Sequence, residues 1–359
     1  MLLTAVILAA LPALTPDDPG FAQQQAAFDR IFLTEAWDLG TGGGQRIGVV
    51  DTGLVRATTD LDDAGGWNFL AGQTGNDAYD ETGPGPLALG SHVAGTIASL
   101  GNNGAGLAGV NWQASVVSAR ALTVDGSQGN NLTIMAAARW LAGLDVANRA
   151  GGGGAPAIDP VDVINISLGI PGGCDPQMQQ DVDDILAAGV VLVAASGNHG
   201  GVFGNGSDEV NAPASCDGVI SVGAFDGDFN QTAYTNANGR VDLLAPGGVD
   251  DDPIFSWGFE ANTIIGQQGT SMAAPHVTGV VSLMRDLDPA LSPADIRAIL
   301  GSLPAREGQV LLNAQTVLAA VTGDITPGGN AFGEQGGCGA TAGGSMATLL
   351  VLLRRRRRR

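Results

Sequence analysis

The chain has 359 residues, of which 44% are hydrophobic and only 14% are charged, so it can form a large apolar core and is not of the disordered class. All 16 basic residues are arginines, and six of them form the terminal run Arg354–Arg359. The rest of the chain has 10 arginines against 36 acidic residues, a net charge of −26, which argues against nucleic-acid binding because such a body repels phosphate backbones. This acidity suits a soluble exported protein or one that binds cations.

The first predicted element is an apolar run at residues 2–14 that has the length of a signal-peptide core. No positive charge precedes it, so either the signal is weak or the true start lies upstream of Met1. A buried N-terminal helix is the alternative. We assign residues 1–15 to a signal peptide and expect a secreted protein.

Apolar segments typical of strands alternate with helical segments between residues 16 and 322. The strand-like segments are Ile47–Val50, Ala114–Val117, Val161–Leu168, Val190–Ala195, Val219–Val222 and Val241–Leu244. The helical segments cover residues 92–100, 131–149, 177–188, 272–286 and 293–302, and the last has Ser292 as its N-cap and Pro293 at its first position. Unbroken apolar strands that alternate with helices predict a three-layer αβα sandwich with a mainly parallel central sheet. Ligands of such sheets bind at the carboxyl ends of the strands, so we expect the functional residues there.

The C-terminal region is of a different composition. Residues 323–344 form a Gly-rich linker that contains Cys338, and residues 345–359 join a short apolar stretch to the arginine run. The stretch is shorter than the roughly 20 residues that a membrane-spanning helix needs, although arginines behind an apolar segment do orient it in a membrane. The arrangement resembles the C-terminal sorting tails of Gram-negative surface proteins, in particular the myxobacterial type with a Gly-Cys element. Cys338 would then be the processing or anchoring point, and a low-complexity tail without such a role is the alternative.

Three polar residues stand at expected ends of strands and helices. Asp51 ends a strand in the sequence Asp-Thr-Gly, His92 opens a run of small residues with helical spacing, and Ser271 stands where a glycine-rich turn enters a helix. Each has an ordinary structural explanation by itself: a strand-end cap, a histidine on a helix face and an N-cap serine. Together in a parallel α/β sheet they form the set that a nucleophilic serine requires.

The segments around these residues are similar to those of the subtilisin-like serine proteases, the subtilases. The similarity extends from about Pro16 to Val321 and includes VINISLG at 163–169, AASGN at 194–198, YTNANGRVDLLAP at 234–246 and GTSMAAPHVTG at 269–279. It implies a subtilisin-like peptidase domain over residues 16–322 and a secreted serine endopeptidase that cleaves protein or peptide substrates through an acyl-enzyme. Two alternatives are a processing protease of narrow specificity and a catalytically inactive subtilase-fold protein that binds peptides at the cell surface. We expect a monomer that meets membranes only through its C-terminal tail.

The resemblance assigns roles to individual residues. It implies Ser271 as the nucleophile, His92 as its general base, Asp51 as the carboxylate that orients the imidazole, and Asn198 in the oxyanion hole. It implies substrate contacts at Ser167, Leu168, Gly169, Ala195, Ser196 and Gly197. The family has a further histidine three residues before the one taken here as the base, and this chain has Leu89 there. We expect altered packing beside the site and retained activity.

The resemblance implies that small residues form one wall of the pocket that receives the substrate side chain before the cut. Because Ala195, Ser196 and Gly197 are small, we expect room for a large side chain. Asp208, Glu209 and Asn211 fall near the other wall, which leaves a preference for basic side chains open.

The resemblance also implies a structural Ca²⁺ site and no organic cofactor. Asp60 and Asn103 match the family's ligands, and a glutamine among Gln23–Gln25 would complete the shell of hard oxygens. A tight Gly/Asn turn without metal is the alternative. Secreted members of the family further imply a disulfide between Cys174 and Cys216, which are the two cysteines inside the predicted folded region.

Overall fold

The computed structural model describes residues 14–56, 58–79, 89–123, 128–199, 208–238, 240–258, 260 and 262–323. Most of the predicted signal peptide, the linker from residue 324 with Cys338, and the whole C-terminal tail lie outside these residues. None of the helices in the described part of the chain combines the length and the apolar composition that a membrane crossing needs.

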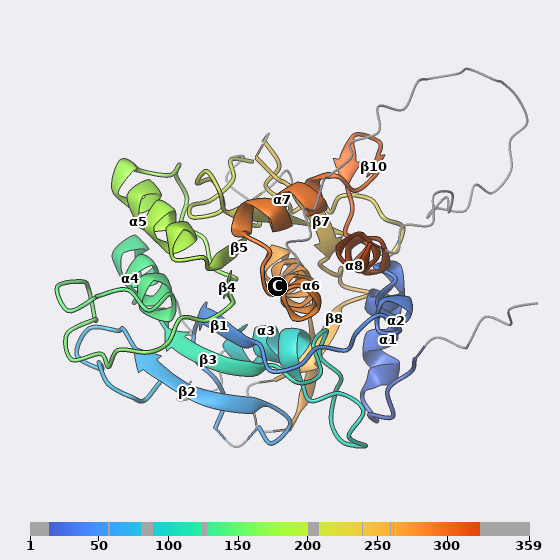
Figure 1. The fold of residues 1–359 in the computed structure, drawn as a ribbon, viewed down its shortest axis with the longest axis horizontal. Coiled ribbons are helices and arrows are strands. Elements are labelled where there is room, and N and C mark those ends of the chain that lie inside the picture. Colours follow the sequence, from blue (N-terminus) through green and yellow to red (C-terminus); the bar gives the residue numbers. More distant parts are fainter. Residues whose placement is uncertain are drawn as a thin grey trace, which may run out of the picture. The chain divides into compact units, whose positions relative to one another are not determined.

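A parallel sheet of seven strands forms the centre of the described chain, in the order β2-β3-β1-β4-β5-β6-β7 (Figure 1). The strands are β1 (Arg46–Asp51), β2 (Asp62–Asn68), β3 (Ser115–Arg120), β4 (Val163–Ile166), β5 (Val191–Ala195), β6 (Ile220–Phe225) and β7 (Leu243–Pro246). All six neighbouring pairs run parallel. The central strands β4, β5 and β6 are buried throughout, as unbroken apolar strands must be when helices cover both faces.

Helices form the two outer layers. On one face α4 (Asn131–Leu141) and α5 (Pro176–Ala187) pack together, and on the other α3 (Leu89–Ala98) packs against α6 (Thr270–Leu287) (Figure 1). The other helices are α1 (Phe21–Arg30), α2 (Leu33–Ala36), α7 (Pro293–Gly301) and α8 (Ala314–Thr322). The predicted αβα sandwich is therefore confirmed. The predicted cap of α7 is also present, since the Ser292 hydroxyl accepts a hydrogen bond from the backbone N–H of Asp295.

Some elements differ from the sequence prediction. The helix expected over residues 131–149 ends at Leu141, and soon afterwards Gly143 takes a left-handed φ of 71°. The strand β2 was not predicted because its first residues, Asp-Asp-Ala-Gly-Gly, are exposed or half-buried and show no apolar alternation. Two antiparallel hairpins were also missed: β8 (Ile254–Trp257) with β9 (Ile264–Gln267), and β10 (Ala305–Arg306) with β11 (Gln309–Val310).

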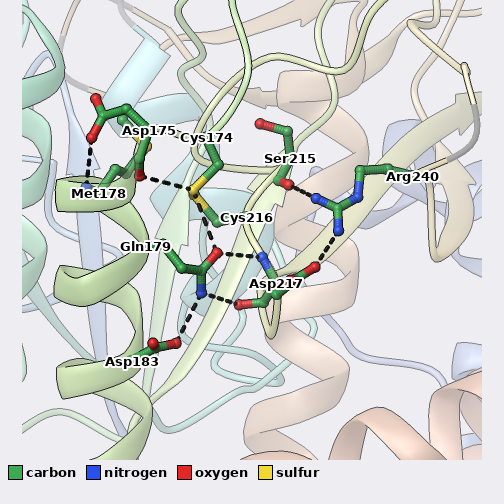
Figure 2. Close-up of a disulfide and its surroundings, with 9 residues drawn as sticks. All are labelled: Cys174, Asp175, Met178, Gln179, Asp183, Ser215, Cys216, Asp217 and Arg240. Atoms are coloured by element: carbon green, nitrogen blue, oxygen red, sulfur yellow. Dashed lines mark hydrogen bonds and ion pairs between the residues drawn. A yellow bond between two sulfur atoms is a disulfide. The ribbon is translucent and has the colours of Figure 1, made fainter.

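The predicted disulfide between Cys174 and Cys216 is confirmed, with 5.0 Å between the two Cα atoms. It joins the loop before α5 to the turn before β6 (Figure 2). Beside it Gln179 of α5 binds the same turn through both ends of its amide: it accepts from the backbone N–H of Asp217 at 2.8 Å and donates to the carbonyl of Asp217 at 3.0 Å. The covalent bond and the amide thus hold the same two segments together.

Replacing both cysteines by serine is expected to lower the free energy of unfolding by about 4 kcal/mol, since the bond closes a loop over a sequence separation of 42 residues in the unfolded chain. Guanidinium titration of the two proteins measures the difference. Gln179→Ala is the matched control, because it removes the two hydrogen bonds to Asp217 and one to the exposed carboxylate of Asp183 and should cost about 1–3 kcal/mol. A double cysteine variant no less stable than Gln179→Ala would contradict the prediction.

Candidate active site

The predicted site residues gather at one edge of the sheet. Asp51 is the last residue of β1, while Ser167 and Ser196 directly follow β4 and β5. The three strands are adjacent and parallel, so their carboxyl ends meet at the same edge. Ser271, in the first turn of α6, reaches this edge through a direct contact with Ser167.

Ser271 and Ser167 are bonded to each other twice. The Ser271 hydroxyl donates to the carbonyl oxygen of Ser167 at 2.9 Å, and the Ser167 hydroxyl donates to the carbonyl oxygen of Ser271 at 2.8 Å. The second bond replaces a missing helical one, because Pro275 has no N–H to donate to the carbonyl four residues before it. Pro275 therefore leaves the Ser271 carbonyl oxygen available to accept from Ser167, and this bond holds the backbone of the nucleophile beside the end of β4.

Asn198 lies next to Ser271 and is held in a defined orientation. Its side-chain oxygen accepts from the backbone N–H of Thr270 at 2.9 Å and from the Thr270 hydroxyl at 2.8 Å. The amide nitrogen is therefore left as a donor on an exposed side chain beside Gly269. The Thr270 hydroxyl also accepts from the N–H of Gly197 at 3.2 Å, so one threonine aligns this loop with the start of α6. Sequence analysis missed Thr270, although its place directly before Ser271 was a usable signal.

The ring of His92 is bonded to β8 and not to the nucleophile. Its side chain is fully buried, and its Nε2 lies 3.0 Å from the carbonyl oxygen of Ile254 in β8. Within the described residues neither ring nitrogen forms a hydrogen bond with Asp51 or Ser271. Burial lowers the pKa of His92 to about 4, with a smaller contribution from His276 and opposition from the Ile254 carbonyl. The expected contact between His92 and Ser271 is thus corrected.

The reason is the position of His92 along α3. The N-terminal end of this helix lies on the Asp51 loop: the N–H of Gly90 donates to the Thr52 hydroxyl at 3.2 Å, and a Cβ on Gly90 would come within 2.1 Å of the Gly53 carbonyl oxygen. His92 lies two residues beyond Gly90, toward the hairpin β8–β9.

Leu89 occupies the end of α3 that meets the Asp51 loop. It is half-buried and packs against an apolar cluster that contains Met272, the neighbour of Ser271. Its side chain has no atom that can accept a proton. The sequence predicted that Leu89 alters the packing beside the site, and the structure places it at the end of α3 that meets the Asp51 loop.

The predicted substrate-binding segments lie on either side of Ser271. Ser167 touches the nucleophile directly, and Gly197 touches Thr270. Gly169 is exposed, and within the described residues nothing bonds to its backbone N–H or C=O. Leu168, Ala195 and Ser196 are buried behind them.

A family model described as the subtilase family matches residues 42–310. This chain belongs to the subtilase family. It is 34% identical to subtilisin DY of Bacillus licheniformis over 74% of this chain and 86% of that protein. It is also 34% identical to an extracellular protease of Xanthomonas campestris, covering 86% of this chain but only 58% of that protein. A solved protease of Pseudoalteromonas arctica superposes with a TM-score of 0.76 at 30% identity, over 86% of this chain and 100% of that one. Subtilases are serine endopeptidases that act on proteins or peptides.

The subtilase's predicted calcium ligands lie around two buried carboxylates, Asp60 and Asp18, each 4% exposed. Asp60 accepts from the Asn103 amide at 2.8 Å and from the N–H of Leu107 at 2.9 Å, while Asp18 accepts from the backbone N–H groups of Asn102 and Asn103. Neither carboxylate forms an ion pair in the described part of the chain. Burial, with a smaller contribution from Asp18, raises the pKa of Asp60.

These residues fit a hard cation. Two buried carboxylates without a basic partner in the described part of the chain, both bonded to the Gly/Asn loop that contains Asn103, are oxygen ligands that Ca²⁺ accepts. The described residues contain no cluster of three or more His, Cys, Asp or Glu side chains suited to a metal. Ligation by Asn103 would need its amide to turn over, since its nitrogen now faces Asp60. Of the three glutamines among which a ligand was expected, Gln24 binds the backbone of Ala108 through both amide atoms, and Gln23 and Gln25 are exposed.

Proposed function

We propose that this subtilase binds extended peptides beside Ser167–Gly169 and hydrolyses them slowly, because no side chain in the described part of the chain is bonded to its nucleophile as a general base. One observation carries the proposal: the Ser271 hydroxyl donates to a backbone carbonyl, while the imidazole of His92 lies against Ile254. A serine hydroxyl is a weak nucleophile until a base removes its proton. The carbonyl oxygen of Ser167 accepts a hydrogen bond but does not take up that proton.

The place of the missing base is position 89. The family has two histidines three residues apart in this segment, and here the second is retained as His92 while the first is Leu89. The N-terminal end of α3, which bears Leu89, is the end that meets the Asp51 loop. We therefore propose that the base of the family stands at position 89, and that His92 serves to hold β8 against α3.

The other members of the site keep their family roles in this proposal. Asp51 would orient an imidazole, Ser271 would attack, and the Asn198 amide with the Ser271 N–H would stabilise the oxyanion. In a subtilisin, loss of the histidine lowers kcat by about 10⁶, and the rest of the site still gives about 10³–10⁴ over the reaction in water. This chain is expected to turn over at a comparably low rate.

Peptide binding does not depend on the base. The exposed Gly169, with its free backbone groups, provides an edge along which an extended peptide can form main-chain hydrogen bonds. Fluorescein-labelled casein tests both halves of the proposal. We expect a saturable rise in anisotropy on binding and almost no release of small fluorescent fragments. A wild-type kcat of about 1 s⁻¹ or more would contradict the slow-hydrolysis proposal, and no binding would contradict the peptide site.

We further propose Ca²⁺ as a structural cofactor bound by Asp60 and Asp18, with Asn103 as a third ligand after rotation of its amide. Ca²⁺ at 100 times its dissociation constant would stabilise the fold by about 2.7 kcal/mol, so EDTA is expected to lower the melting temperature by about 5 °C. Asp60→Asn should remove this response, whereas the exposed Asp62→Asn should keep it. A melting temperature that EDTA leaves unchanged in the wild type would exclude the site.

Export is the remaining part of the proposal. Relatives from Xanthomonas campestris and Dichelobacter nodosus are named as extracellular proteases, and the disulfide suits an oxidising compartment. We propose that this chain is likewise secreted, and that its C-terminal tail with Cys338 serves to anchor it at the cell surface.

A further inference from the structure

The disulfide between Cys174 and Cys216 lies a few residues from the exposed Gly169, where peptides are proposed to bind. Ile170 directly follows this glycine. Its backbone N–H donates to the carbonyl of Ala212 at 3.0 Å, and its carbonyl accepts from the N–H of Ala212 at 3.1 Å. Each of these two residues stands four positions before a cysteine of the disulfide. The hydrogen-bonded pair and the covalent bond therefore close a small loop of chain that continues the peptide edge.

The two sides of this closed loop are held differently. On one side, Asn211 donates its backbone N–H to the carbonyl of Ser196 at 2.9 Å. The N–H of Cys216 donates to the carbonyl of Pro213 at 2.9 Å, so this side is fixed both to the end of β5 and to itself. On the other side, residues 171–173 are exposed, and no described residue forms a backbone hydrogen bond with them. The disulfide therefore attaches a loosely held segment to a firmly held one.

Both sulfur atoms are placed for thiol–disulfide exchange. Cys174 is half-buried, so a thiolate from solution can reach its sulfur. Cys216 is 3% exposed, but it lines a cavity of about 140 Å³. The charged residues of the cavity wall form two ion pairs, Arg240 with Asp217 and Arg297 with Asp242. Such a polar cavity has room for several water molecules, which can hydrate the Cys216 thiolate when the bond opens.

We infer that the disulfide is a redox switch of the peptide site: the edge at Gly169 binds peptides while the bond is closed and loses most of its affinity when the bond is reduced. The inference rests on the proposed peptide-binding function. In reduction, one thiolate of a dithiol attacks the Cys174 sulfur and the Cys216 thiolate leaves. The second thiol of the reagent then attacks the mixed disulfide, Cys174 leaves, and the reagent departs as a cyclic disulfide. Two electrons and two protons thereby pass from the dithiol to the two cysteines.

The switch fits the compartments through which an exported chain passes. Thiols stay reduced in a reducing compartment, and disulfides persist in an oxidising one. On export, a disulfide reagent accepts two electrons and two protons from the cysteine pair and becomes two thiols, while the protein disulfide forms. The chain therefore gains its affinity for peptides after it leaves the compartment in which it is made.

The test measures the Kd of a fluorescein-labelled, cysteine-free casein peptide by anisotropy, on the full chain with and without dithiothreitol. Reduction is expected to weaken binding at least about ten-fold, because the freed segment must be ordered again when the peptide binds. Reoxidation with glutathione disulfide should restore the original Kd. The variant with both Cys174→Ser and Cys216→Ser should bind as weakly as the reduced wild type and should not respond to dithiothreitol.

Gln179→Ala is the matched control, because it removes the hydrogen bonds to Asp217 beside the disulfide and leaves the disulfide itself in place. It should bind the peptide as the oxidised wild type does and should keep the full response to dithiothreitol. An equal loss of affinity in oxidised Gln179→Ala would overturn the inference, since any weakening of this region would then have the same effect.

Hydrogen exchange separates a local switch from a loss of the fold. On reduction, the amides of Ile170 and Ala212 should exchange at least about ten-fold faster, while the amides of β5 keep their protection. If all of these amides lose protection together, the bond is structural only and the inference is overturned. If the oxidised wild type binds the peptide and reduction leaves its Kd unchanged, the inference is likewise overturned and the peptide site stands. If the oxidised wild type binds neither this peptide nor labelled casein, the proposed function itself fails.

Discussion

Leu89→His is expected to raise kcat for casein hydrolysis by at least about 10³-fold, the largest single effect that the structure predicts. The substitution places an imidazole at the end of α3 that meets Asp51 and packs near Met272, the neighbour of Ser271. Because position 89 is only half-buried, the new histidine can change its charge near neutral pH, as a general base must. Release of fluorescent fragments under single-turnover and steady-state conditions measures the gain.

Two controls separate a restored base from a general change in packing. Leu89→Gln introduces a polar side chain of similar length that cannot act as a base, and it should leave kcat at the wild-type level. Leu89→His with Ser271→Ala should lose the whole gain. The rate of the Leu89→His protein should also rise with pH through the pKa of one histidine, a dependence that repacking alone does not produce. If Leu89→His is no faster than Leu89→Gln, position 89 is not the place of the base.

Stability is expected to fall steeply between pH 6.5 and pH 4, because two fully buried histidines stay neutral in the folded chain. His276 is buried in the same way as His92. Its Nδ1 lies 2.8 Å from the Met272 carbonyl oxygen and its ring packs edge-on against Phe28, and burial lowers its pKa to about 4. The unfolded chain binds protons at these groups below pH 6.5, whereas the folded chain does not until about pH 4. The contribution of the two neutral histidines to the free energy of unfolding is therefore complete above pH 6.5 and is lost as the pH falls toward 4.

The expected loss is about 3 kcal/mol per histidine at pH 4, from a difference of about 2.5 pKa units between the unfolded and folded chain. Urea titrations at pH 7 and pH 4.5 measure it. Carboxylates also titrate in this range, so the informative quantity is the change caused by His92→Asn and His276→Asn. Each variant should be less sensitive to acid than the wild type by about 2–3 kcal/mol. Equal acid sensitivity in the wild type and both variants would refute the role of the buried pair.

Much of the architecture was determined by the sequence itself. Parallel strands buried on both faces must be apolar throughout, so β4, β5 and β6 were visible as unbroken runs. Exposed or short elements such as β2 and the hairpin β8–β9 have no such pattern. Hydrogen bonds to neighbouring strands stabilise them more than the intrinsic strand propensity of their residues does. The segments that bear Asp51, Ser167, Asn198 and Ser271 were recognisable from their resemblance to those of the subtilases.

What the sequence alone could not decide is which side chain of each segment faces the nucleophile. The motif around His92 predicted a general base. Successive residues of a helix point in different directions, so the motif did not show which of them faces the site. The hydrogen bond between Gly90 and Thr52 shows that the end of α3 with Leu89 lies at the Asp51 loop. Likewise, the sequence placed Gly197 in one wall of a roomy pocket and Asn211 near the other wall, and only the structure shows how closely the Asn211 side chain approaches Gly169 and Gly197. Local composition specifies strands and helices, whereas the depth and direction of a side chain depend on packing between segments far apart in the chain.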